Sequence, residues 1–381
     1  MADISSVYRG YTIKTAPDQL HKLPFEQKIG QLFFVGISGP EVDARTAQLI
    51  ADISPGGICL FARNIKDPRQ TRELLDTLRG SLQKIPFLSV DQEGGRVDRF
   101  RRIMPASPAA SKFTSVDDVI EFAEITANAL QLLGFNMDFA PVVDVIDDVR
   151  ESAGNGLFSR SFGRNSADVV SFAGAFLKTL QKNGVIGCLK HFPGLGASGV
   201  DSHEELPQIT ISEDEIRNTD LFPYGELIPN KAEMVMVAHA AYPKVRLQER
   251  DRDGRLLPST LSRNFVSELL RDELGFTGVA ITDDLEMGAI VRNYGIGEAC
   301  KMAVKAGNDM VAICSSESAM CEGFEAVSNA VASGDIPESR IDDSVERISR
   351  LKSKIASPVD FDIESLNEIS DRLLKLNARL N

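Results

Sequence analysis

The sequence predicts a single (β/α)8 barrel, an α/β fold in which eight parallel strands alternate with helices. Three observations support this fold class. Short apolar segments alternate with amphipathic helical segments along the whole chain. The apolar segments are nearly continuous, as in parallel strands that are covered on both faces. Their number is eight, which is the number that closes this type of barrel.

The predicted strands are, in chain order, 29–37, 56–61, 87–91, 137–145, 187–192, 233–239, 278–284 and 309–314. An open, doubly wound parallel sheet is the alternative, because a strand count from one sequence can err by one or two. Both folds place a functional site at the carboxyl ends of the strands.

Helix boundaries are visible between the strands. Ser115 stands where a helix N-cap is expected, and Gly134 stands where that helix ends. Ser262 opens a second helix, which Gly275 closes. A third helix is indicated by a stripe of leucines at positions 74, 75, 78 and 82.

No linker rich in proline, serine or glycine divides the chain, so residues 1–381 are predicted to form one domain. The charged segment Gln248–Arg255 is expected to be a surface turn. The tail from about residue 352 predicts a helix that packs on the outside of the barrel.

Composition limits the classes of partner. The chain has 381 residues, of which 43% are hydrophobic and 25% charged, and its net charge is −13. These fractions are typical of globular proteins, and the acidic balance without a basic block argues against nucleic acid or an anionic membrane as partner. No apolar stretch is long enough to span a bilayer, and no signal region precedes the first strand. The five cysteines lack CxxC spacing, so we expect buried thiols in a cytoplasmic protein.

Polar residues gather where the predicted strands end. These residues are Asp91, Asp144, Lys190 with His191, His239, and Asp283 with Asp284. Three of the four histidines, at positions 191, 203 and 239, lie at or just after strand ends. Each alone could be a structural histidine, but together they indicate a site.

The loop after the fifth strand is too long for an ordinary connection, and it carries Asp201 and His203. A carboxylate two residues from an imidazole can orient it as a base on a mobile lid. A polar surface loop and a metal site are the alternatives. The ammonium of Lys190 beside His191 would compete with a cation, so no metal is predicted.

A carboxylate at the mouth of a barrel can act as the nucleophile in glycosyl transfer. Successive residues point to opposite sides of a strand. Only one of Asp283 and Asp284 is therefore expected to face the pocket, and the other is expected to cap the following helix.

Segment 190–207, KHFPGLGASGVDSHEELP, resembles the signature of the bacterial β-N-acetylglucosaminidases of glycoside hydrolase family 3. Five further segments resemble the family in the expected order, and together they cover residues from about 25 to 355. They are VDQEGGRVDRF (90–100), NMDFAPVVDV (136–145), SRSFG (159–163), MVMVAHAAYP (234–243) and GVAITDDLEMGAI (278–290). Leu195 departs from the family pattern, in which many members carry histidine. The sequence is expected to contain the barrel domain alone, as in the short, single-domain members of the family.

The resemblance implies roles for individual residues. Asp283 matches the nucleophile, His203 the proton donor and acceptor, and Asp201 its partner. The positions that match sugar contacts are Asp91, Arg99, Arg160, Lys190 and His191, with Met236 nearby. No cofactor is implied.

The expected activity is hydrolysis of terminal β-linked N-acetylglucosamine (GlcNAc) with retention of the anomeric configuration. The resemblance implies that peptidoglycan fragments are the substrate. The expected partner is thus a small carbohydrate. A β-glucosidase or a phosphorylase of the same family, and a non-catalytic sugar-binding barrel, are the alternatives.

Overall fold

Eight parallel strands close into a barrel in the computed structural model, which describes residues 17–152, 157–199 and 205–380. Around the barrel the strands follow the order β1-β10-β9-β8-β7-β6-β3-β2. Their bounds are β1 Phe33–Gly36, β2 Gly57–Leu60, β3 Phe87–Val90, β6 Met137–Asp138, β7 Ile186–Phe192, β8 Met234–Val237, β9 Val279–Asp284 and β10 Met310–Ile313. A short antiparallel pair, β4 (Gln92–Gly94) and β5 (Val97–Asp98), follows β3. The prediction of a (β/α)8 barrel is confirmed, and the open sheet is excluded.

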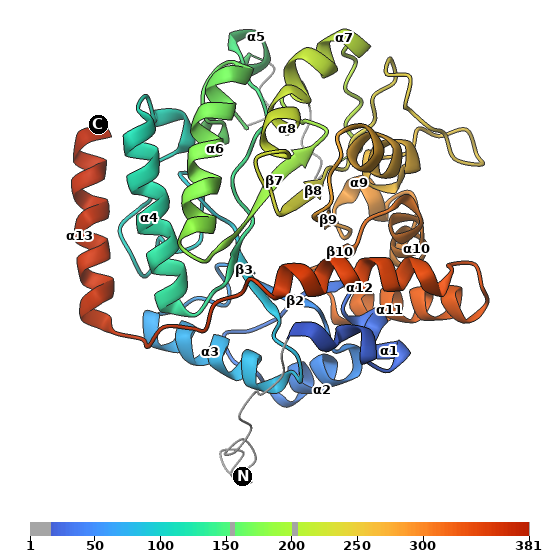
Figure 1. The fold of residues 1–381 in the computed structure, drawn as a ribbon, viewed down its shortest axis with the longest axis horizontal. Coiled ribbons are helices and arrows are strands. Elements are labelled where there is room, and N and C mark those ends of the chain that lie inside the picture. Colours follow the sequence, from blue (N-terminus) through green and yellow to red (C-terminus); the bar gives the residue numbers. More distant parts are fainter. Residues whose placement is uncertain (1–16, 153–156, 200–204, 381) are drawn as a thin grey trace.

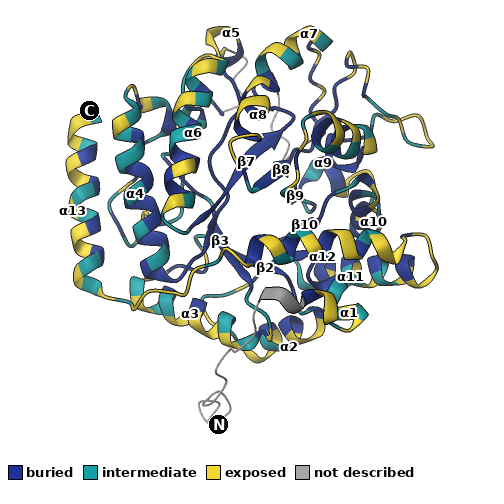
Figure 2. Ribbon diagram, viewed as in Figure 1, coloured by how far each residue is buried: buried dark blue, intermediate teal, exposed yellow. Residues whose placement is uncertain are grey.

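Helices surround the barrel, with their exposed faces outward and the strands buried inside them (Figures 1 and 2). The longer helices are α2 Ala44–Ile53, α3 Pro68–Ser81, α4 Val116–Leu133, α6 Ser166–Lys182, α10 Ile296–Ala306, α11 Glu317–Ala332, α12 Glu338–Lys352 and α13 Ile363–Leu380. The shorter ones are α1 Phe25–Gly30, α5 Asp148–Glu151, α7 Glu213–Glu215, α8 Phe222–Leu227 and α9 Gly288–Val291. A π-helical segment, η7, spans Asn264–Glu273.

All eight predicted strands exist, and most are one to three residues shorter than predicted, but two are much shorter. The segment 29–37 begins inside helix α1, because the chain turns before Phe33. In the segment 137–145, regular strand pairing is limited to β6. Pro141 interrupts the pairing, since it has no N–H to donate to a neighbouring strand. Val142 rejoins the barrel wall through a single bridge to Lys190.

The predicted helix boundaries agree with the structure. The Ser115 side chain accepts a hydrogen bond from the Asp117 N–H at the start of α4, and Gly134 ends that helix with φ of 101°. Ser262 accepts from the N–H of Phe265 as η7 begins, and Gly275 follows with φ of 67°. Helix α13 packs against α4 on the outside of the barrel (Figure 1). No described helix is long and apolar enough to cross a membrane.

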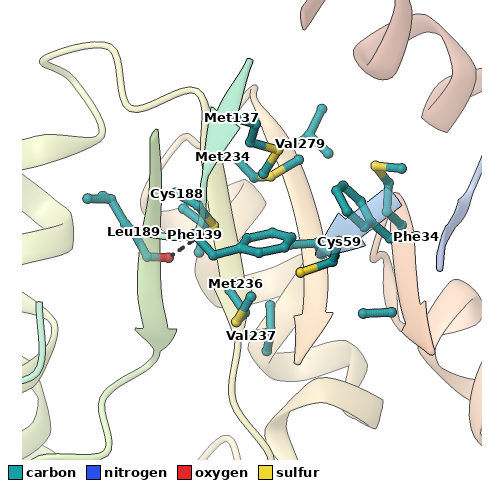
Figure 3. Packing of buried hydrophobic residues seen from close by; sticks show 14 of the residues in the cluster. Phe34, Cys59, Met137, Phe139, Cys188, Leu189, Met234, Met236, Val237 and Val279 are labelled. Carbon is teal, nitrogen blue, oxygen red and sulfur yellow. Dashed lines mark hydrogen bonds between the residues drawn. The ribbon is translucent and has the colours of Figure 1, made fainter. Parts of the chain in front are cut away.

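Apolar side chains fill the interior of the barrel. Figure 3 shows the ring of Phe139 pointing across the interior toward the strands that carry Cys59 and Phe34. The ring centroids of Phe34 and Phe139 lie 5.1 Å apart. Because Phe139, Cys59 and Met236 also line the pocket above this layer, the packed core forms the floor of the site.

Candidate active site

A pocket of about 280 Å³ opens at the carboxyl ends of the barrel strands. Seven of the nine site residues predicted from the sequence line it: Asp91, Arg99, Arg160, Lys190, His191, Met236 and Asp283. The other two, Asp201 and His203, lie outside the described residues. The strand ends thus bring together side chains that are up to 192 positions apart in the chain.

Both Asp283 and Asp284 line the pocket, so the prediction that only one of them faces it was wrong. The reason is a bulge in β9. Ile281 pairs with Met310, and Asp284 pairs with Ala312, so three steps along β9 oppose two along β10. An extra residue of this kind interrupts the alternation of side chains. The Asp284 carboxylate accepts the N–H of Glu286 at 3.0 Å and caps this turn, not helix α9.

A second bulge presents Lys190 and His191 together. Leu189 pairs with Val235 and Phe192 with Val237, so β7 carries one residue more than β8 in this interval. Both side chains consequently line the pocket although they are adjacent in the chain.

Lys190 lies between two carboxylates. Its Nζ is 2.7 Å from an oxygen of Asp91 and 2.6 Å from one of Glu93, and the lysine side chain is 2% exposed. Burial favours the neutral amine, but the two carboxylates outweigh this effect and raise the Lys190 pKa. The lysine is therefore a fixed cation in the wall of the pocket.

Glu93 connects this lysine to Arg160. Arg160 Nε and Nη2 donate to the two oxygens of Glu93 at 2.7 and 2.9 Å. Burial opposes the charged form of Glu93, but Arg160 and Lys190 overcome this and hold the Glu93 pKa well below its usual range. The fork geometry fixes the guanidinium plane as well as its position.

His191 is oriented from both sides. Its Nδ1 lies 2.7 Å from an oxygen of Asp144, and its Nε2 lies 3.3 Å from Arg160 Nη2. Because a guanidinium can only donate, Nε2 is the acceptor and Nδ1 carries the hydrogen toward Asp144. Asp144 also accepts the N–H of Leu195 at 2.7 Å, which attaches the loop after β7 to this side of the pocket.

Asp283 is a partly buried carboxylate at the end of β9. Burial acts to raise its pKa, but electrostatic interaction with His239, His191 and Lys190, and the N–H of Asp284 at 2.8 Å, more than compensate. The Asp283 pKa consequently lies below its usual value. Asp284 behaves in the opposite way, since burial raises its pKa to about 7.

Arg99 and Phe61 form part of the rim. Arg99 Nη2 is 3.8 Å from Asp91, and its guanidinium carbon lies 5.9 Å from the centre of the Phe61 ring. Arg96 is exposed and lines the same rim. The rim therefore offers cationic donors beside an aromatic face.

Sequence reasoning missed three carboxyl groups. Glu93 and Asp144 orient the lysine, the arginine and the histidine, and Asp138 lies buried at the end of β6 beside them. Glu93 stands in the QEGG segment and Asp144 at a predicted strand end, so both positions were in view. Their role depends on partners 47 or more residues away, which the sequence does not display.

Among the described residues, the charges that line the pocket are balanced, with four carboxyl groups (Asp91, Glu93, Asp283, Asp284) and four cations (Arg96, Arg99, Arg160, Lys190). Dense, fixed donors and acceptors without an excess of charge suit an uncharged ligand that has many hydroxyl groups. Among the described residues, no group of three or more His, Cys, Asp or Glu side chains could hold a metal ion. The fold and the pocket thus define a barrel enzyme of the carbohydrate-acting class.

Comparison with known proteins identifies the family. Residues 24–351 match the model of the glycosyl hydrolase family 3 N-terminal domain, so the chain belongs to this family and is a glycoside hydrolase. The resemblance seen in the sequence motifs is confirmed.

Named relatives agree with this assignment. A β-hexosaminidase of Pseudomonas aeruginosa strain LESB58 is 36% identical over 286 residues, covering 73% of this chain and 80% of the relative. A β-hexosaminidase of Tolumonas auensis is 32% identical over 303 residues, covering 78% and 86%. The solved structure of a family 3 β-N-acetylglucosaminidase from Paenibacillus sp. FPU-7 superposes with a TM-score of 0.82 at 34% identity, covering 93% of this chain and 69% of that one.

Proposed function

We propose that the protein is a retaining exo-β-N-acetylglucosaminidase in which Asp283 is the nucleophile. The observation that carries the proposal is the ionised, partly buried Asp283 carboxylate in a pocket of fixed polar groups. The names of the relatives supply the sugar, since β-hexosaminidases and a β-N-acetylglucosaminidase are among them. A packed floor closes the pocket at its inner end, which favours action on a chain terminus.

In the first step, an oxygen of Asp283 attacks the anomeric carbon while the bond to the leaving oxygen breaks. The resulting glycosyl ester is then attacked by water, and Asp283 leaves as a carboxylate. A lowered pKa serves both steps, because it keeps the attacking group ionised and makes it a better leaving group. The alkoxide that departs first needs a proton from a separate acid.

The non-reducing sugar is bound, in this proposal, by Asp91, Arg99, Arg160, Lys190 and His191, with Met236 against its apolar side. The ion pairs of Glu93 and Asp144 support these contacts, since they hold the donors in place before the sugar arrives. Preorganised charged hydrogen bonds cost little to align, which is why they favour the transition state.

His203, oriented by Asp201, is proposed as the proton donor and acceptor. The proposal rests on the sequence motif, since both residues lie outside the described part of the chain. The preceding residues support it, because the Leu195 N–H is bound to Asp144 beside His191. The histidine common in the family at position 195 is not needed for this backbone contact, so we expect the leucine to preserve catalysis.

Peptidoglycan fragments are the proposed natural substrate, and the cytoplasm is the proposed location. The substrate assignment follows the family resemblance. Five free cysteines, four of them buried, fit a reducing compartment.

The experiment that tests the activity compares p-nitrophenyl β-GlcNAc with p-nitrophenyl β-glucoside, with and without phosphate. We expect hydrolysis of the GlcNAc compound, no dependence on phosphate, and no turnover by Asp283→Ala. Preference for the glucoside would indicate a β-glucosidase, and a sugar 1-phosphate product would indicate a phosphorylase. Full activity of Asp283→Ala would exclude the assigned nucleophile.

The acid role of His203 is tested with leaving groups of different basicity. His203→Ala should slow glycosylation by about 10²–10⁴-fold for poor leaving groups and much less for dinitrophenol, which needs little protonation. An equal loss for every leaving group, measured in the pre-steady state, would argue against an acid role.

A further inference from the structure

We propose that a groove at the amino-terminal end of the barrel, opposite the active site, binds a phosphate-bearing small molecule. Four cationic side chains line it: Lys231, Arg347, Arg350 and Lys354. Lys231 precedes strand β8, and the other three belong to the end of helix α12 and the residues after it. The active site lies at the carboxyl ends of the strands, so the sugar and the phosphate-bearing molecule would bind at opposite ends of the barrel.

The groove has a volume of about 540 Å³ and one apolar wall, which includes Leu274 and Phe276. Its single carboxylate, Glu233, is 2.7 Å from Lys354. Arg350 donates to the carbonyl of Thr277 at 2.6 Å. In the described part of the chain, neither Lys231 nor Arg350 has a carboxylate within 4 Å. The lining therefore carries an excess of positive charge, unlike the balanced active site.

The layer below the groove increases this excess. The buried carboxylate of Asp309 is shared by three arginines, at 2.5 Å from Arg271, 2.9 Å from Arg347 and 3.8 Å from Arg340. Burial is the main effect that lowers the pKa of both Arg271 and Arg340, and repulsion from Arg347 adds to it. The attraction of Asp309 does not compensate for these two effects. An anion seated on Arg347 and Arg350 would relieve this repulsion.

The chemistry of the groove selects the ligand class. Guanidinium groups donate paired hydrogen bonds to oxyanions, and a phosphate ester carries up to two negative charges to meet them. The protein as a whole has a net charge of −13, so general attraction does not concentrate anions here. The apolar wall beside the cations leaves space for the organic part of a phosphorylated molecule.

The test is a calorimetric titration of the intact protein with inorganic phosphate and with glucose 6-phosphate, at an ionic strength held constant with sodium chloride. We expect saturable binding of both and a rise of the melting temperature beyond that in chloride, since a ligand of the native state stabilises it. The double variant Lys231→Gln/Arg350→Gln should bind at least tenfold more weakly.

The matched control is Lys244→Gln/Arg246→Gln, which removes the same two charges from exposed positions elsewhere. It should bind phosphate as the unmodified protein does. Equal responses to phosphate and chloride, or equal weakening in the two double variants, would overturn the proposal. Binding of glucose 6-phosphate without binding of phosphate would likewise contradict recognition through the phosphate group.

Discussion

Neighbouring carboxyl groups of the pocket are driven in opposite directions by their surroundings. Asp283 has a lowered pKa because interaction with His239, His191 and Lys190, together with a backbone N–H, outweighs its burial. In Asp284, one residue further, burial dominates and raises the pKa to about 7. Asp283, the candidate nucleophile, is therefore ionised near neutral pH, whereas the Asp284 carboxyl group is partly protonated there.

Lys190 provides the most direct test of the sugar contacts. Removing a buried, charge-assisted hydrogen bond costs about 1.5–3 kcal/mol, so Lys190→Ala should lower kcat/KM by roughly ten- to a hundredfold. Steady-state kinetics on p-nitrophenyl β-GlcNAc measure this. Lys178→Ala, on the exposed face of α6, is the control and should be silent. An unchanged kcat/KM in Lys190→Ala would show that the lysine does not contact the sugar.

Asp138 should make stability fall as pH rises. Burial raises its pKa from an ordinary 3.8 to about 8, and one of its oxygens accepts the N–H of Gln92 at 2.9 Å. Between these pH values the native state holds a proton that the unfolded state has lost. Stability therefore falls with pH by up to about 1.4 kcal/mol per unit from this group.

Asp138→Asn keeps the acceptor for Gln92 and removes the titration. Urea denaturation at each pH measures the unfolding free energy of both proteins. We expect the variant to be more stable than the unmodified protein by an amount that grows from pH 5 to pH 8. Parallel stability curves for the two proteins would show that Asp138 is ionised in the native state throughout.

At the scale of elements, two bulges decide which side chains reach the pocket. The sequence motifs located the ends of β7 and β9 correctly, and these ends carry Lys190, His191 and Asp283. The alternation of side chains along a strand nevertheless predicted that only one residue of the 283–284 pair faces the pocket. The bulge in β9 is visible only in its register with β10. Pairing across strands is a non-local property, which explains why reasoning along one strand could not find it.

Helix α13 lies beyond the 24–351 match and is held by a narrow apolar face. Leu373 is 1% exposed, whereas its neighbour Leu374 is 52% exposed. Leu373→Ala should lower the unfolding free energy by about 2–5 kcal/mol through lost burial and a cavity. Leu374→Ala should change it by less than about 0.5 kcal/mol.

Urea denaturation of both variants measures the difference, and hydrolase activity at 25 °C should persist in each because α13 covers α4, away from the pocket. Equal effects of the two substitutions would mean that α13 does not pack through the Leu373 face.

At the scale of the whole molecule, the two ends of the barrel differ in how far the sequence revealed them. The carboxyl end was located from motifs, because its residues stand at strand ends in recognisable segments. The amino end was not, since Asp309 meets Arg271 of η7 and two arginines of α12, Arg340 and Arg347, and no local pattern joins these segments. Its groove became apparent only when the closed barrel brought these segments together.

The same end contains a buried lysine that should shape the pH dependence of the whole fold. Lys352 ends helix α12 and is 4% exposed. Its Nζ donates to the side chain of Gln31 at 2.8 Å and lies 5.2 Å from the centre of the Phe87 ring. Burial lowers its pKa from an ordinary 10.5 to about 7. No carboxylate lies within 4 Å of it among the described residues, so no opposite charge balances the buried ammonium.

Between about pH 7 and pH 10.5 the unfolded state holds a proton that the native state has released. Stability should therefore rise with pH in this window, by up to about 1.4 kcal/mol per unit, opposite in sign to the effect of Asp138. Lys352→Met fills similar space without a charge, so its advantage over the unmodified protein should be largest below pH 7 and shrink toward pH 9. Urea denaturation at pH 6, 7, 8 and 9 measures this change. An advantage that stays constant over the series would mean that Lys352 remains protonated in the native barrel.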